Sequence, residues 1–148
     1  MTLLFVRHAV ALRRRDWTQP DDLRPLSPRG YQQADEFPDT LADFEVARIL
    51  SSPSTRCLET VGPLAARLGL PIEERGELAE GAGTAALALL EGLDATTVLC
   101  SHGDVVPALL AAVVGPERLP VGDLPCEKGS TWVVEEDRTK ATYLPPPA

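Results

Sequence analysis

Cysteine and long apolar runs are scarce in this sequence, and each shortage excludes a class of protein. The longest apolar run, Ala108–Val114, is far shorter than the roughly 20 residues that a membrane-spanning helix needs, so we expect no membrane partner. The three cysteines, Cys57, Cys100 and Cys126, have neither metal-ligand spacing nor an even count for disulfides. This pattern is typical of free thiols in a reducing cytoplasm, where we expect the protein to be.

Positive charge is also in short supply. Fourteen Lys and Arg residues stand against 22 Asp and Glu residues, which gives a net charge of −8. Such a balance argues against general binding to nucleic acid or to anionic membranes. An anionic ligand therefore has to be attracted by a local cluster of arginines. Because a first strand begins almost at Met1, we expect no signal peptide. The length favours a single domain over residues 1–148.

Histidine is scarce, with two copies in the chain, and both follow short apolar runs. Leu3–Val6 precedes Arg7 and His8, and Thr97–Cys100 comes shortly before His102. Such runs indicate strands buried on both faces of a parallel sheet, and open α/β sheets bind ligands beyond the carboxyl ends of their strands. A lone histidine at a strand end is more often a surface or hydrogen-bonded residue. The repeated context favours a functional pair.

The remaining elements alternate along the chain. Capping residues, proline, glycine and apolar spacing predict helices over 28–37, 55–68, 84–93 and 104–114. Pro38 should kink or stop the first helix, and Gly69 should close the second. Short apolar runs predict further strands over 48–50 and 70–73 and a hairpin of 131–134 with 141–144. Polar and turn-rich loops are expected over 13–25, 76–83 and 115–128. This order predicts a three-layer α/β/α sandwich with a mostly parallel central sheet.

The predicted strand ends bring Arg7, His8, Arg56 and His102 to one edge of one sheet. Arginine's planar fork pairs with two phosphate oxygens at once, and neutral imidazole can carry a phosphoryl group covalently. The motif residues include no pair of carboxylates to hold Mg²⁺ or Zn²⁺, so we expect neither a metal nor another cofactor. The sequence therefore predicts a site for a phosphoryl group.

Four segments of the chain resemble, in the same order, the motifs of the histidine phosphatase (phosphoglycerate mutase-like) superfamily, in particular its small SixA-like members. They are Arg7-His8-Ala9, Leu23 to Gly30, Ser51 to Thr60 and Ser101-His102-Gly103. Residues 99–105 and 128–132 are also similar to the phosphatase-like domain found C-terminal to Nudix domains in some actinobacterial hydrolases. Each segment alone is a weak match, but four in family order are specific.

The resemblance implies a phosphoglycerate mutase-like fold and a role for each strand-end residue. His8 would be the nucleophile, while Arg7, Arg56 and His102 would bind the non-bridging phosphoryl oxygens. Water would then hydrolyse the phosphohistidine.

Further roles follow from the same resemblance. Glu80 would protonate the leaving oxygen, with Glu77 as the reserve candidate, and Arg24 would reach an outer phosphate or the substrate. Both glutamates are equally compatible with solvated loop positions. Two departures stand out: Ala9 replaces the usual glycine, and Arg13–Arg15 occupy the region where many larger members carry an asparagine. The arginine triplet can be read as a solvated run or as a basic rim for an anionic substrate.

Two classes of function remain open at this point. The first is a metal-independent phosphatase acting through a phosphohistidine intermediate on a phosphohistidine protein, a nucleotide or a small phosphomonoester. The second is a module that binds phosphorylated ligands with weak or no turnover. A mutase is less favoured, because reorienting an intermediate needs insertions over the pocket that this short chain lacks. Turnover of an aryl phosphate in the presence of a chelator would separate the first two.

Overall fold

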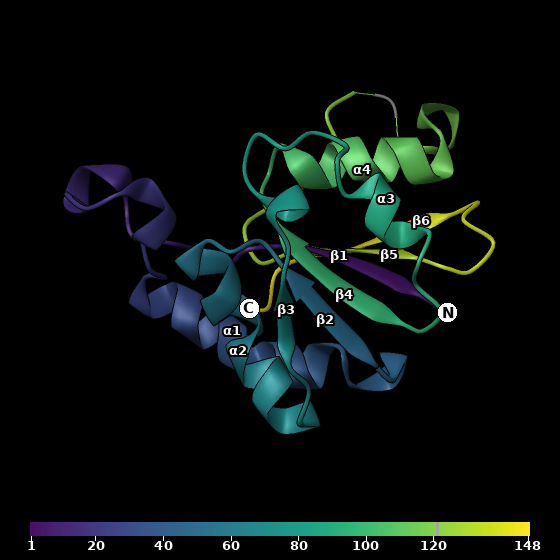
Figure 1. The fold of residues 1–148 in the computed structure, drawn as a ribbon. Coiled ribbons are helices and arrows are strands. Elements are labelled where there is room, and N and C mark those ends of the chain that lie inside the picture. The colour runs from purple at the N-terminus through teal and green to yellow at the C-terminus, as the bar shows by residue number, and fades with distance from the viewer. Residues whose placement is uncertain (121) are drawn as a thin grey trace.

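The computed structural model describes residues 1–120 and 122–148, and its middle layer is one six-stranded sheet (Figure 1). The strands are β1 (Leu3–Arg7), β2 (Arg48–Ser51), β3 (Ile72–Glu74), β4 (Thr97–Ser101), β5 (Thr131–Val134) and β6 (Ala141–Leu144). Their order in the sheet is β3-β2-β4-β1-β5-β6. Strands β3, β2, β4 and β1 run parallel, and the hairpin of β5 and β6 adds antiparallel to β1. The predicted mostly parallel sheet and the C-terminal hairpin are confirmed.

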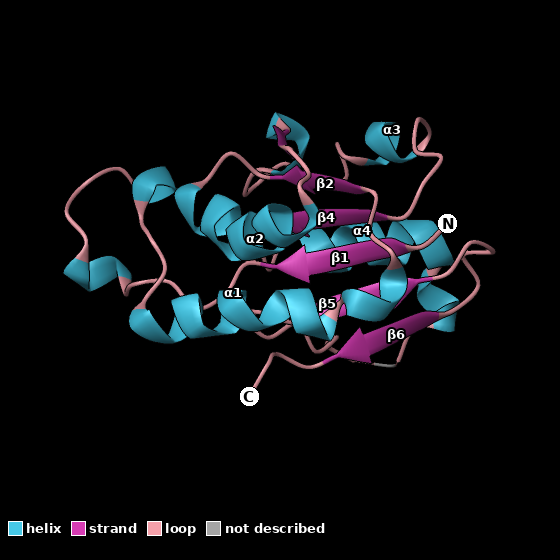
Figure 2. Ribbon diagram, turned by 90° about the horizontal axis from the view of Figure 1, so that it is seen from below, coloured by secondary structure: helices cyan, strands magenta, loops and turns pink. Residues whose placement is uncertain are grey.

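Helices cover both faces of the sheet, which completes the predicted three layers (Figures 1 and 2). One face carries α1 (Pro28–Thr40) and α2 (Thr55–Leu68), and the other carries α3 (Leu87–Leu90) and α4 (Val105–Val114). Alternate residues of β1 serve the two layers: Leu4 and Val6 pack with α1 and α2, while Leu3 and Phe5 pack with α3 and α4. Because the sheet is covered on both faces, its central strands are continuous apolar runs.

The helix boundaries follow the capping chemistry in the sequence. Ser27 caps α1 by accepting a hydrogen bond from the Gly30 amide at 3.1 Å, with Pro28 at the first helical position. Ser54 precedes α2 without a side-chain capping bond. Gly69 ends α2 in the left-handed region at φ 65°, where glycine is favoured.

Two expectations about helices need correction. Of the two outcomes expected at Pro38, a stop is wrong, because Pro38 lies inside α1 and the helix continues to Thr40. The amide that proline lacks falls in the last turn, and Pro38 is buried, so packing of the helix outweighs the lost bond. The helix expected over 84–93 is shortened to the single turn of α3, because bonds between residues three apart, such as Leu89 amide to Ala86 carbonyl, close the segment into tight turns. Residue 121 of the expected loop over 115–128 lies outside the described residues.

The topology gathers several chain segments at one edge of the sheet. β1, β2 and β4 are parallel neighbours, and their registers pair Arg7 with Ser101 and Ser51 with Cys100 at their carboxyl ends. β5 runs the opposite way, so the segment that precedes it reaches the same edge, where the Arg7 amide donates to the Ser130 carbonyl at 3.0 Å. None of the described helices is long and apolar enough to span a bilayer.

Candidate active site

A cavity of about 270 Å³ opens at this edge of the sheet. The residues that line it are Arg7, His8, Arg13, Arg14, Arg24, Arg56, Glu80, His102, Gly103 and Lys128. They come from the ends of β1 and β4, the first turn of α2 and the loops around the edge. The structure thus brings together the four residues that the strand ends predicted, and places Arg24 and Glu80 with them.

His8 is held in one orientation and kept neutral. Its Nδ1 lies 2.7 Å from the carbonyl oxygen of Ala9, and because a carbonyl only accepts, Nδ1 carries the proton. Burial is the main cause that lowers the pKa of His8 to about 3, and electrostatic repulsion from His102, Arg56 and Arg7 adds to it. The hydrogen bond to the Ala9 carbonyl opposes this shift. The ring therefore offers Nε2 as an unprotonated nitrogen over the ordinary pH range.

The turn after His8 accommodates alanine without strain. Ala9 is fully buried, and it is not among the residues with positive φ, so its Cβ causes no backbone strain. Its amide donates to Thr60 Oγ1 at 2.9 Å, and Thr60 Oγ1 in turn donates to the Arg56 carbonyl at 2.7 Å. Thr60 thus joins the His8 turn to the start of α2.

Gly103 leaves the space that Arg7 fills. A Cβ at position 103 would lie 2.7 Å from Arg7 Cζ and 2.9 Å from its Nε, closer than real contacts allow. Arg7 Nη1 donates to the Cys126 carbonyl at 2.6 Å, while its buried Nε has no acceptor among the described residues. The guanidinium is therefore fixed from one side and packed against the glycine on the other.

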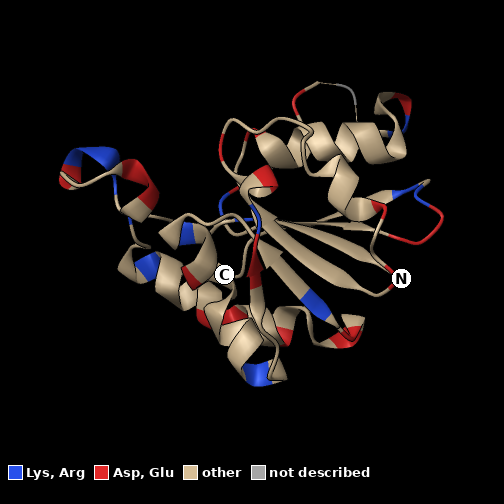
Figure 3. Cartoon of the chain, viewed as in Figure 1, with Lys and Arg blue, Asp and Glu red and all other residues tan. Residues whose placement is uncertain are grey.

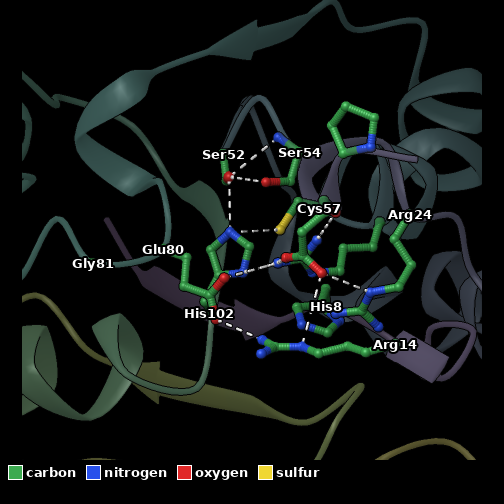
Figure 4. A network of polar contacts seen from close by, with 12 residues as sticks. His8, Arg14, Arg24, Ser52, Ser54, Cys57, Glu80, Gly81 and His102 are labelled. Carbon is green, nitrogen blue, oxygen red and sulfur yellow. Dashed lines mark hydrogen bonds and ion pairs between the residues drawn. The ribbon is translucent and has the colours of Figure 1, made fainter. Parts of the chain in front are cut away.

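His102 is tied to the turn after β2 (Figure 4). Its Nε2 lies 2.9 Å from Ser52 Oγ and 3.6 Å from Cys57 Sγ. Its Nδ1 lies 3.5 Å from Arg56 Nη2. The ring centroids of His8 and His102 are 5.4 Å apart. Both imidazoles thus face one small space from separate strands.

Arg56 is 2% exposed and is surrounded by partners. Its Nη1 donates to the Asp21 carbonyl at 2.9 Å, and its Nη2 lies 3.3 Å from Asp21 Oδ2 and 3.1 Å from Glu80 Oε2. Its Nε is buried and, like that of Arg7, has no acceptor among the described residues. A buried guanidinium with such fixed geometry is suited to planar recognition of an oxyanion.

Arg24 lies closer to the site than its place in a loop suggested. It is 7% exposed, donates from Nη1 to the Leu12 carbonyl at 2.6 Å and from Nε to Asp21 Oδ1 at 3.0 Å. Asp21 therefore joins Arg24 to Arg56. Although partial burial raises it, the pKa of Asp21 is lowered overall by the hydrogen bond from Arg24 and by the charges of Arg56, Arg24 and Arg14. Asp21 could not be recognised from the sequence, since its partners are far from it in the chain or in an irregular loop.

Of the two glutamates considered as proton donors, Glu80 lines the cavity and Glu77 does not. Glu80 also contacts Arg14, with 3.4 Å between Oε1 and Nη2. The loop that carries Glu80 is held by Asp104, whose Oδ2 accepts from the Gly81 amide at 2.8 Å. This bond ties the glutamate to the start of α4.

Lys128 also lines the cavity, although no motif in the sequence predicted it there. It enters because β5 is antiparallel to β1, so the residues before β5 arrive at the carboxyl end of the parallel strands. The only sequence signal was its position in the segment 128–132 that resembles the family. Among the described residues, no group of three or more His, Cys, Asp or Glu side chains is arranged to hold a metal ion.

The fold and the two histidines at the sheet edge define a class of phosphate-transferring proteins, and sequence comparison agrees. The sequence profile of the histidine phosphatase superfamily (branch 1) matches residues 3–87. The chain belongs to the histidine phosphatase superfamily.

Among curated relatives, an 8-oxo-(d)GTP phosphatase of Mycolicibacterium smegmatis is 34% identical over 161 residues, covering 99% of this chain and 48% of the relative. The uncharacterized protein Rv0525 of Mycobacterium tuberculosis is 40% identical over 57 residues, covering 38% of this chain and 28% of the relative. The chain thus spans about half or less of the length of these relatives.

Solved structures agree with the fold over nearly the whole chain. The SixA protein of Agrobacterium tumefaciens has a TM-score of 0.76 at 25% identity, with 99% of this chain and 97% of that chain covered. A mycobacterial glucosyl-3-phosphoglycerate phosphatase in complex with inorganic phosphate has a TM-score of 0.70 at 18% identity, covering 99% and 95%. The SixA-like branch and the mutase-like fold expected from the motifs are confirmed.

Proposed function

We propose that this chain is a metal-independent phosphatase that works through a phosphohistidine at His8. The observation that carries the proposal is the state of His8. A neutral ring, with Nδ1–H fixed on the Ala9 carbonyl at 2.7 Å, sits in a cavity lined by Arg7, Arg56 and His102. A nucleophile needs such an unprotonated, oriented nitrogen.

In the first step, His8 Nε2 attacks phosphorus, the Nε2–P bond forms, and the bond from phosphorus to the leaving oxygen breaks. Arg7, Arg56 and His102 bind the three non-bridging oxygens and stabilise the charge that shifts onto them. The buried Nε–H groups of Arg7 and Arg56 lack protein acceptors among the described residues, so phosphoryl oxygens are natural partners for them.

Glu80 is the proton donor to the leaving oxygen in this proposal. It lines the cavity and contacts Arg56, which holds its carboxyl near the phosphoryl site. General acid catalysis of this kind is typically worth ~10²–10⁴-fold in rate. In the second step water attacks phosphorus, the Nε2–P bond breaks, and phosphate leaves.

The substrate belongs to the phosphorylated compounds that such a site can hold: a phosphohistidine protein, a nucleotide or a small phosphomonoester. The name of the Mycolicibacterium smegmatis relative supports a nucleotide, and the SixA name supports a phosphohistidine. A binding module without turnover is the competing function.

Steady-state hydrolysis of p-nitrophenyl phosphate in EDTA tests the proposal. Wild type is compared with His8→Asn, and the surface variant Arg67→Gln serves as a control. Among the described residues, the ion-pair partner of Arg67 is Asp39, on the outside of α1 and α2. We expect turnover in wild type and Arg67→Gln, inhibition by vanadate, and a loss of at least ~10³-fold in His8→Asn. Activity that disappears in EDTA and returns with a divalent ion, or that survives in His8→Asn, would contradict the proposal.

A further inference from the structure

The cavity holds more positive charge than one phosphoryl group requires. It is lined by six of the chain's fourteen Lys and Arg residues, although the chain as a whole carries a net charge of −8. The acidic side chains that pair with this set are Glu80 and Asp21. A phosphate monoester carries about two negative charges near neutral pH, so a surplus of positive charge remains after it binds.

The surplus is carried by residues other than Arg7 and Arg56, which flank the two histidines. It consists of Arg13, Arg14, Arg24 and Lys128, which we call the outer cations. Arg13 and Arg14 belong to the loop between β1 and α1, in which basic and acidic segments lie close together (Figure 3). Lys128 belongs to a different segment of the chain, the one that precedes β5.

Lys128 shows the imbalance most clearly. Partial burial and the positive charges of Arg7, Arg24 and Arg14 lower its pKa. No carboxylate of the described residues forms an ion pair with it. An ammonium group among guanidiniums is stabilised when an anion binds between them.

We propose that the outer cations form a second anion subsite, and that the substrates of this site are phosphoanhydrides, whose second phosphate binds there while the terminal phosphoryl group meets His8. This inference rests on the proposed function and specifies its substrate class. One bridging oxygen separates the two phosphates of such a substrate, so both fit into one continuous cationic cavity of about 270 Å³.

The same lining indicates what the site does not recognise. Apart from the two histidine rings, the described residues that line the cavity include no aromatic and no aliphatic side chain. Recognition of a nucleobase usually needs a stacking surface or an apolar wall. The phosphate chain is therefore the recognised part, and the group attached beyond it stays outside the cavity.

The reaction balances without a further reactant. His8 Nε2 forms a bond to the terminal phosphorus, and the bond from that phosphorus to the bridging oxygen breaks with its electron pair left on the shortened phosphate. Water then forms a bond to phosphorus as the Nε2–P bond breaks, and its proton is released to solvent. Because a phosphate is a good leaving group, this substrate class depends on Glu80 less than an alkyl phosphate does.

Rates with two substrates test the subsite. The kcat/KM values for inorganic pyrophosphate and for p-nitrophenyl phosphate are compared in wild type, Lys128→Met and Lys140→Met at one ionic strength. The chain has two lysines, and Lys140 is an exposed residue before β6, which makes it a matched control. We expect Lys128→Met to reduce kcat/KM for pyrophosphate at least ~5-fold more than for the aryl phosphate, and Lys140→Met to change neither. An equal reduction for both substrates would overturn the subsite.

Nucleoside diphosphates test the claim about recognition. ADP, GDP and CDP should be hydrolysed by wild type with kcat/KM values within ~3-fold of one another, since the cavity offers no surface for a base. A preference of more than ~10-fold for one base would overturn it.

A binding measurement keeps the two proposals separable. In His8→Asn, calorimetry should give tighter binding of pyrophosphate than of inorganic phosphate by ~10-fold or more, and Lys128→Met in that background should remove most of the difference. If wild type hydrolyses the aryl phosphate while pyrophosphate neither binds more tightly nor turns over, the subsite is wrong and the phosphatase stands. If no substrate turns over and pyrophosphate still binds, the proposed activity is wrong and the subsite stands.

Discussion

At the scale of single residues, the tautomer of His102 decides whether it can assist catalysis. To donate from Nδ1 to a phosphoryl oxygen, a neutral imidazole must be unprotonated at Nε2 and accept a hydrogen bond there, and the Ser52 hydroxyl lies 2.9 Å from that atom. In the free site Arg56 Nη2 lies 3.5 Å from Nδ1, and a bound phosphoryl oxygen would take its place as the partner of Nδ1. Ser52 is therefore a positioning residue for His102. Its hydroxyl is fully buried, so water does not readily replace it.

We predict that Ser52→Ala lowers kcat by ~10-fold with little change in KM, because the donating tautomer is no longer favoured. Nitrogen-15 NMR of the imidazole should show a shift of the His102 tautomer at the same time. Ser54→Ala is the matched control, since Ser54 Oγ contacts Ser52 Oγ at 3.4 Å and makes no capping bond to α2. An unchanged His102 spectrum in Ser52→Ala would contradict this role.

Substitutions of the two arginines joined by Asp21 should affect different kinetic constants. Arg56→Lys keeps the charge but loses the planar guanidinium, including the unpartnered Nε–H that would bind a phosphoryl oxygen in the proposed mechanism, so we expect kcat for an aryl phosphate to fall by ~10²-fold. Arg24→Lys should mainly raise KM, because Arg24 belongs to the outer cations and contributes to ground-state binding. Steady-state kinetics of both variants with one substrate makes the comparison. Equal effects on KM alone would show that Arg56 is a rim residue.

At the scale of elements, the loop after β4 has to leave room for the Arg7 guanidinium. We predict that Gly103→Ala lowers kcat/KM at least ~10-fold, because the added Cβ would stand 2.7 Å from Arg7 Cζ. Gly62→Ala is the matched control: a Cβ at position 62, within α2, meets nothing within 4 Å.

The control should keep full activity and gain ~0.5–1 kcal/mol of stability, because alanine is the better helix former. Kinetics and thermal unfolding of both variants are the measurements. Full activity in Gly103→Ala would mean that Arg7 moves without cost.

The elements also show how far sequence reasoning reaches. The strands β1, β2 and β4 and the helix ends at Ser27 and Gly69 follow local rules, namely apolar runs, capping and left-handed glycine, and local rules are visible in one sequence. The positions of Arg7, His8, Arg56 and His102 followed because parallel strands share a carboxyl edge. Pro38 was misjudged because tertiary packing decided the end of α1.

Lys128 and Asp21 could not be found in this way. Lys128 reaches the cavity only because β5 pairs antiparallel with β1, and a hairpin pattern does not reveal which strand it joins. Asp21 acts through Arg24 and Arg56, and its contacts depend on the irregular path of the loop between β1 and α1. Irregular loops carry no periodic signal from which such contacts can be predicted.

At the scale of the whole molecule, keeping His8 neutral costs stability in acid. An unfolded His8 titrates near 6.5, whereas the pKa of the folded residue is lowered to about 3. Between these values the unfolded chain binds more protons than the folded chain, so the free energy of unfolding falls as the pH falls from about 6.5 towards 3.

We predict that His8 alone lowers the free energy of unfolding of wild type by about 2–3 kcal/mol between pH 7 and pH 4.5. The free energy of unfolding of His8→Asn should fall by that much less than that of wild type over the same interval, while the carboxylates contribute equally to both proteins. Urea denaturation of the two proteins at pH 7 and pH 4.5 gives the difference. Equal losses would contradict the depressed pKa of His8.

The central claim is that the phosphoryl group passes through Nε2 of His8, and trapping the intermediate tests it most directly. Wild type is mixed with a rapidly hydrolysed phosphate substrate, quenched in alkali, and examined by peptide mass spectrometry and phosphorus-31 NMR, with His102→Asn beside it. The account predicts a base-stable, acid-labile phosphate on His8 with the chemical shift of the Nε2 isomer, since Nδ1 is bound to the Ala9 carbonyl. Label on Nδ1 of His8, on His102 or on no histidine during turnover would contradict it.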